Sequence, residues 1–157
     1  MKALTLWRPW TWAIASSSPH AKRIENRTWS PPRYILGDEI AIHAGKHYDD
    51  DAWESIADVM QEHPPGPMLC PTGIVAVARV VGYCTKANVR DEHRAWFTGP
   101  KAWILRDVRT LCEPVPCSGA QGLWIVPADV ERLVRERLPA KNEGPGEDDL
   151  EHARRHV

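Results

Sequence analysis

The sequence predicts an α+β fold: a small closed or nearly closed mixed or antiparallel β-barrel of five to six strands with two to three flanking helices. Two observations lead to this prediction. Short apolar segments with strand-like alternation recur along the chain and are separated by Pro- and Gly-rich turns, without an internal repeat. A few other segments change to the three- and four-residue spacing of helices. A chain of 157 residues is usually one domain and can bury a sizeable core.

Six segments have the composition of strands. The strongest is Gly73–Tyr83, an almost continuous apolar run that we expect at the centre of the sheet. In the segment 23–29, strand alternation places Glu25 and Arg27 on one face. The expected strands are 3–6, 23–29, 39–44, 73–83, 103–108 and 122–126.

Three segments are expected to be helical. The first begins near Pro9, because proline fits the first turn of a helix, and extends to about Ser17. The second follows the acidic run 49–51, which favours a helix N-terminus and is more typical of a solvated helix start than of a metal site. The third follows Pro127 and has apolar residues at helical spacing to Leu138. Residues 85–100 are expected to be irregular.

The domain is expected to span 1–138, followed by a flexible charged tail over 139–157 that is rich in Gly, Pro and acidic residues. We find no leader-like segment and no apolar run of membrane-spanning length, so we expect a cytoplasmic protein without membrane contact. The four cysteines contain no Cys-x-x-Cys pair, and free thiols are therefore expected, with no metal and no cofactor.

Positive charge and tryptophan occur in the same parts of the chain. Residues 1–46 carry seven Lys or Arg against three Asp or Glu, and residues 71–126 carry seven against four. These two segments hold seven of the eight tryptophans. Cations interleaved with aromatic rings suit single-stranded nucleic acid, because phosphates bind the cations and bases stack on the rings. The overall charge of −1 disfavours binding of long duplexes.

The segment His20–Trp29 contains the most informative cluster, in which Lys22, Glu25 and Arg27 follow one another at short spacing. Such a cluster either forms ion pairs on a surface or lines a small polar pocket. The apolar, tryptophan-rich segment just upstream favours the pocket.

Four segments resemble the ASCH domain family, a branch of the PUA superfamily. The segment 20–27 matches the signature Gly-x-Lys-x-x-Glu-x-Arg, except that His20 takes the place of the glycine. The segments Leu4–Trp10, Ile42–Lys46 and Gly119–Trp124 are similar to stretches common in bacterial members. The resemblance covers residues 2–138 and implies a PUA-like barrel with a cleft for RNA or a modified nucleotide.

Within that cleft, Lys22 would contact a phosphate or carbonyl group or act as a general base. Glu25 would accept hydrogen bonds from an exocyclic amine or hold Lys22, and Arg27 would offer a planar fork of donors. The candidate binding residues are Trp7, Arg8, Trp10, Lys22, Glu25, Arg27, Trp29, Lys46, Gln121 and Trp124.

Whether the protein catalyses a reaction is left open by the sequence. We place first a binding protein for single-stranded RNA or a modified nucleotide. The alternative is a small hydrolase, either a ribonuclease on single-stranded RNA or an amidohydrolase of N4-acylated cytidine, in which Lys22 and Glu25 would be catalytic. The resemblance weakens the amidohydrolase, because such ASCH enzymes use a threonine where this chain has Glu25. A role in protein interaction ranks third.

His43, in an apolar strand, is expected to be a hydrogen-bonded core histidine rather than a catalyst.

Overall fold

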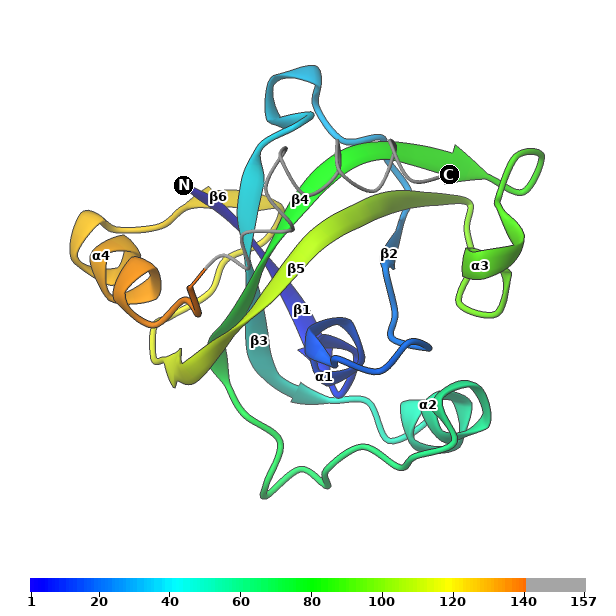
Figure 1. Cartoon of the computed structure of the whole chain (residues 1–157), viewed down its shortest axis with the longest axis horizontal. Helices are drawn as coiled ribbons and strands as arrows, with labels where there is room; N and C mark the ends of the chain where they lie inside the picture. Colours follow the sequence, from blue (N-terminus) through cyan, green and yellow to red (C-terminus); the bar gives the residue numbers. More distant parts are fainter. Residues whose placement is uncertain (141–157) are drawn as a thin grey trace, which may run out of the picture.

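A computed structural model describes residues 1–140 and shows an α+β fold, one six-stranded mixed sheet curled into a half-barrel with four helices (Figure 1). The strands are β1 (Lys2–Arg8), β2 (Ile24–Arg27), β3 (Glu39–Tyr48), β4 (Gly73–Thr85), β5 (Lys101–Val115) and β6 (Leu123–Ile125). The helices are α1 (Trp10–Ala15), α2 (Ala52–Met60), α3 (Asp91–Arg94) and α4 (Ala128–Glu136), with a 3₁₀ turn at Arg33–Ile35.

The order of strands in the sheet is β2-β5-β4-β3-β1-β6. All neighbours are antiparallel except β1 and β3, which are parallel. The long strands β4 and β5 change register three times along their pairing. Such irregularities increase local bending and twist, and they explain why the sheet curls. Because β2 and β6 are edge strands, the sheet forms a half-barrel that is not closed by hydrogen bonds.

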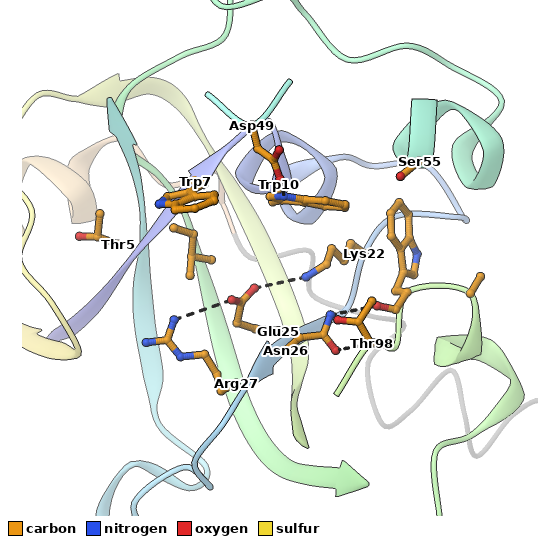
Figure 2. Close-up of a pocket in the computed structure, with 13 residues that line it drawn as sticks. Thr5, Trp7, Trp10, Lys22, Glu25, Asn26, Arg27, Asp49, Ser55 and Thr98 are labelled. Carbon is orange, nitrogen blue, oxygen red and sulfur yellow. Dashed lines mark hydrogen bonds and ion pairs between the residues drawn. The ribbon is translucent and has the colours of Figure 1, made fainter. Parts of the chain in front are cut away.

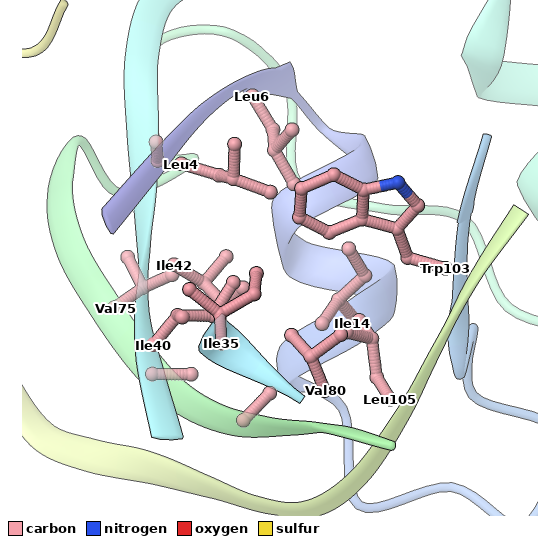
Figure 3. Packing of buried hydrophobic residues seen from close by; sticks show 13 residues of the cluster. Leu4, Leu6, Ile14, Ile35, Ile40, Ile42, Val75, Val80, Trp103 and Leu105 are labelled. Carbon is pink, nitrogen blue, oxygen red and sulfur yellow. The ribbon is translucent and has the colours of Figure 1, made fainter. Parts of the chain in front are cut away.

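Buried apolar residues form clusters on both faces of the sheet, and one of these clusters fills the inside of the curve. Helix α1 lies within it, and its Ile14 is fully buried against β1 and β5 (Figures 1 and 3). Trp103 of β5 is also fully buried, and its indole N–H donates to the carbonyl of Trp29 at 2.8 Å. This bond satisfies the one polar atom of the Trp103 side chain. Further aliphatic side chains complete the cluster: Leu4, Leu6, Ile35, Ile40, Ile42, Val75, Val80 and Leu105.

The six expected strands and three expected helices are all present. The main differences are that β5 extends over 101–115 instead of 103–108, and that the irregular segment 85–100 contains the short helix α3. Residues 1–140 therefore contain four helices, where two to three flanking helices were expected. A helix of four residues is too short to show a helical period in the sequence, which is why the prediction missed it.

The expected flexible tail, 139–157, lies outside the described residues from position 141 onward. Within residues 1–140, no helix combines the length and the apolar character needed to cross a membrane.

Candidate functional site

Lys22, Glu25 and Arg27 converge on one cavity of about 570 Å³ (Figure 2). Lys22 lies in the loop that leads into β2, and the other two side chains come from β2 itself. The backbone N–H of Lys22 donates to the carbonyl of Ala13 at 3.0 Å, so the end of α1 positions this loop. Of the two interpretations of the cluster, the pocket is the one that the structure shows.

The lysine is nearly inaccessible, with 4% of its side chain exposed. Its ammonium donates to the carbonyl of Ile24 at 2.7 Å and to Glu25 Oε2 at 3.2 Å, and it lies 5.8 Å from the centre of the Trp10 ring. An ammonium group has three donors, so one remains for a ligand. A carbonyl oxygen can only accept, so Lys22 is the donor in the contact with Ile24.

Arg27 lies on the other side of Glu25. Its Nη1 is 3.9 Å from Glu25 Oε1, and its guanidinium lies 5.3 Å from the centre of the Trp29 ring. Within residues 1–140, its buried Nε has no hydrogen-bond partner. The guanidinium is thus held by a cation–π contact and a long ion pair, and its terminal nitrogens can bind a ligand.

Tryptophans form the wall opposite these charges. The rings of Trp7 and Trp10 lie above the row of Lys22, Glu25 and Arg27 (Figure 2). Trp7 is 56% exposed, an unusual exposure for so large an apolar side chain. Trp10 is fixed, because its indole N–H donates to Asp49 Oδ2 at 2.9 Å. Asp49, which the sequence indicated as part of a helix start, thereby has a second role in the cavity wall.

The remaining side of the cavity comes from the segment before β5. Trp96 meets Trp10 edge-on, with ring centres 6.5 Å apart, and its indole N–H donates to the carbonyl of His20 at 3.2 Å. Asn26 is a residue of β2 and links this segment to the strand by two hydrogen bonds. Its amide N–H donates to the Trp96 carbonyl at 3.0 Å, and its side-chain oxygen accepts from the backbone N–H of Thr98 at 3.0 Å. Asn26, Trp96 and Thr98 were missed by the sequence analysis.

A second cavity, of about 920 Å³, adjoins the first and shares Thr5, Trp7 and Arg27 with it. Two further predicted residues, Lys46 and Gln121, line this second cavity and not the first. The loop 116–122 forms one of its sides.

Thr5 and His43 form a buried polar network beside this loop. His43 is 4% exposed, its Nδ1 lies 3.1 Å from Thr5 Oγ1, and its Nε2 lies 2.8 Å from the carbonyl of Cys117. Because that carbonyl can only accept, the proton must be on Nε2. Trp124 completes the network by donating to Thr5 Oγ1 at 3.0 Å. His43 is therefore buried and hydrogen-bonded, as the sequence indicated, and it also lines the second cavity.

Three predicted binding residues line neither cavity. Arg8 is 8% exposed, and its guanidinium donates to four backbone carbonyls at 2.7 to 3.1 Å, those of Gly45, Lys46, Pro67 and Cys70. Trp29 packs on the core and edge-on to Trp103, with ring centres 4.7 Å apart. Trp124 packs on His43. The structure thus places these three side chains outside both cavities: the polar groups of Arg8 and Trp124 are hydrogen-bonded within the fold, and the Trp29 ring lies against the guanidinium of Arg27.

The structure offers little other reactive chemistry near the cavities. Among residues 1–140, no group of three or more His, Cys, Asp or Glu side chains is placed to hold a metal ion. Burial raises the pKa of the Cys117 thiol, next to the second cavity, and also that of Cys70. Both thiols are therefore in the weakly nucleophilic protonated form at neutral pH.

No protein-family model matches the sequence, and no curated protein matches it. Solved structures of the ASCH protein from Zymomonas mobilis are similar to this chain. A tyrosine-to-phenylalanine variant has 15% identity and a TM-score of 0.49, over 88% of this chain and 98% of that chain. A serine-to-alanine variant has 14% identity and a TM-score of 0.48, over 88% and 96%. The protein without a stated mutation has 15% identity and a TM-score of 0.47, over 88% and 95%.

Proposed function

We propose that this protein binds single-stranded RNA or a modified nucleotide and holds one base in the first cavity. The observation that supports the proposal is the meeting of Lys22, Glu25 and Arg27 with the rings of Trp7 and Trp10 in one space of about 570 Å³. This volume lies within the range of small-molecule sites.

The chemistry of the walls fits a nucleobase. A base has a flat face that stacks on an aromatic ring, and the half-exposed Trp7 offers such a ring. Its edge carries both donors and acceptors. Glu25 would accept from an exocyclic amine, while Lys22 and Arg27 would donate to ring nitrogens or carbonyls.

A single-stranded ligand is favoured because the cavity lies between β2 and the tryptophan wall, where a base can enter only when it is unpaired and unstacked. A base in a duplex would first have to be flipped out, at a cost of a few kcal/mol. The overall charge of −1 also supports a short contact with nucleic acid over a long duplex interface.

Binding can be tested with a labelled ten-nucleotide single-stranded RNA, compared with a duplex DNA of the same length, by fluorescence anisotropy at low and rising salt. We expect tighter binding of the RNA, weakening as salt increases. The variant Arg27→Gln should reduce the affinity about tenfold, in line with the roughly 1–3 kcal/mol of a charged hydrogen bond. Arg33→Gln is the matched control, since Arg33 is exposed and lines neither cavity.

Equal binding of RNA and duplex, or the same affinity for Arg27→Gln as for the control, would contradict the proposal. The hydrolase alternative is measured on the same protein, with N4-acetylcytidine and end-labelled RNA as substrates and Lys22→Ala beside the wild type. Turnover by the wild type that Lys22→Ala abolishes would show that the protein is a hydrolase and would overturn the proposal of binding alone.

A further inference from the structure

The two cavities differ in charge. Acidic and basic side chains are balanced in the first, where Glu25 and Asp49 accompany Lys22 and Arg27. The described residues that line the second include Arg27 and Lys46 but neither Asp nor Glu. The first cavity is thus suited to the mixed edge of a base, whereas the second is suited to an anion.

The loop beside the second cavity adds neutral donors. Within residues 1–140, none of the backbone N–H groups from Ser118 to Gln121 donates a hydrogen bond, and all four residues line the cavity. Successive backbone amides in a loop are a common way to bind phosphate. The hydroxyl of Ser118, an exposed residue, is a further donor on the same loop.

This loop contacts the polar network of Thr5 and His43 at two points. His43 holds it by its bond to the carbonyl of Cys117, and Gly119 lies directly against Thr5 and His43. A Cβ at position 119 would lie 2.3 Å from Thr5 Oγ1 and 2.8 Å from the His43 ring. Only glycine allows so close an approach, so the loop passes directly against Thr5 and His43 where it lines the cavity.

Arg27 and Trp7 lie at the boundary, because each lines both cavities. A nucleotide has the same two parts side by side: a base, and a phosphate separated from it by one sugar. A base beside Trp7 in the first cavity would therefore direct its phosphate towards Arg27 and Lys46.

We propose that the second cavity is a phosphate subsite, which binds the phosphate attached to the nucleoside whose base occupies the first cavity. This inference rests on the proposed function and specifies its ligand as a nucleotide, not a free nucleoside. The phosphate is either the terminal group of a mononucleotide or a phosphodiester within an RNA strand.

The test is titration calorimetry with cytidine, uridine, adenosine and guanosine, their 3′- and 5′-monophosphates, and the corresponding dinucleotides. For the preferred base, we expect a monophosphate or dinucleotide to bind about tenfold more tightly than the nucleoside, as expected for charged hydrogen bonds. Lys46→Met should reduce this advantage to about threefold or less, with nucleoside affinity within about twofold of the wild type. Lys86→Met is the matched control, because Lys86 is an exposed lysine that lines neither cavity.

Each outcome separates the two proposals. Nucleosides that bind as tightly as their phosphates, or a Lys46→Met variant that behaves like the control, would overturn the subsite and leave the base pocket in place. If neither nucleosides, nucleotides nor RNA bind, both proposals are overturned. A dinucleotide that binds more tightly than either monophosphate identifies the phosphate as an internal phosphodiester, and equal affinities identify it as a terminal group.

Discussion

Lys22 and Glu25 form an ion pair of 3.2 Å at the cavity, and both side chains are largely removed from solvent, with 4% and 13% exposed. The pair does not lie on a helix, because Lys22 is in the loop before β2 and Glu25 is the second residue of that edge strand. The ion pair therefore links the loop before β2 to the strand itself, and both of its charges line the cavity.

We expect Lys22 and Glu25 to be energetically coupled. Removal of one member of a buried pair leaves the other charge without its partner, so Lys22→Met and Glu25→Gln should each lower the free energy of unfolding by about 2–4 kcal/mol. The double variant should be at least about 1 kcal/mol more stable than the sum of the single losses implies. Urea unfolding of the four proteins measures this cycle. Strictly additive losses would show that the two groups do not interact in solution.

Arg8 is expected to stabilise the fold without contacting a ligand. Its guanidinium donates to carbonyls of β3 and of the segment 67–70, which a lysine ammonium cannot reach together. Arg8→Lys should therefore reduce the free energy of unfolding by about 2–4 kcal/mol. The exposed Arg33 provides the control, since Arg33→Lys should change it by less than about 0.5 kcal/mol. Similar unfolding curves for both variants would refute this role.

Gly119→Ala should destabilise the protein by about 1–3 kcal/mol, because the added methyl group would overlap Thr5 Oγ1 and the His43 ring. Gly66→Ala is a suitable control, since a Cβ there meets no atom within 4 Å. Thermal unfolding monitored by circular dichroism compares the two. If the alanine at 119 is as well tolerated as that at 66, the loop is not held against the network.

Glu39 should make the stability depend on acidic pH. Partial burial alone would raise the pKa of Glu39, but the hydrogen bond from Arg109 at 2.7 Å and the charges of Arg79 and Arg135 lower it below its ordinary value of 4.5. A carboxyl group with a lowered pKa contributes stability above its unfolded value, and this contribution is lost as the pH falls through the folded value. The difference in unfolding free energy between wild type and Glu39→Gln should be largest near pH 6 and shrink below about pH 4.5. A difference that is constant down to pH 3 would contradict this.

His93 should act in a separate, higher pH range. Burial lowers the pKa of His93 below its ordinary value of 6.5, and Arg106 and Arg90 add to this against the opposing charge of Glu92. The folded state thus favours the neutral ring. The contribution of His93 to the free energy of unfolding is therefore complete above pH 6.5 and is lost as the pH falls below that value. NMR titration should show the His93 ring protonating below pH 6.5, and the stability advantage over His93→Gln should decrease in the same range. A midpoint above 6.5 would reverse the sign and exclude the burial effect.

Much of the fold follows from local sequence. The apolar run of β4 and the segments around Leu4 and Ile42 could be predicted as strands because short, nearly continuous apolar runs are typical of strands that are buried on both faces. The helix at 91–94 could not be predicted, since a single turn has no period. The curl of the sheet could not be predicted from local sequence either, because it arises from register shifts between β4 and β5.

The site divides in the same way. Lys22, Glu25 and Arg27 lie within six residues, so the sequence by itself determined that a cation, an anion and a forked donor lie close together. The tertiary structure decided what surrounds them. Asp49 and Trp96 reach the cavity from distant segments of the chain. The guanidinium of Arg8 donates to four backbone carbonyls that come close to it only in the folded protein, so it is not available to a ligand. Spacing along the chain fixes neighbours within a strand, but the partners of a side chain across the core depend on which strands pair and in what register, a property of the folded molecule as a whole.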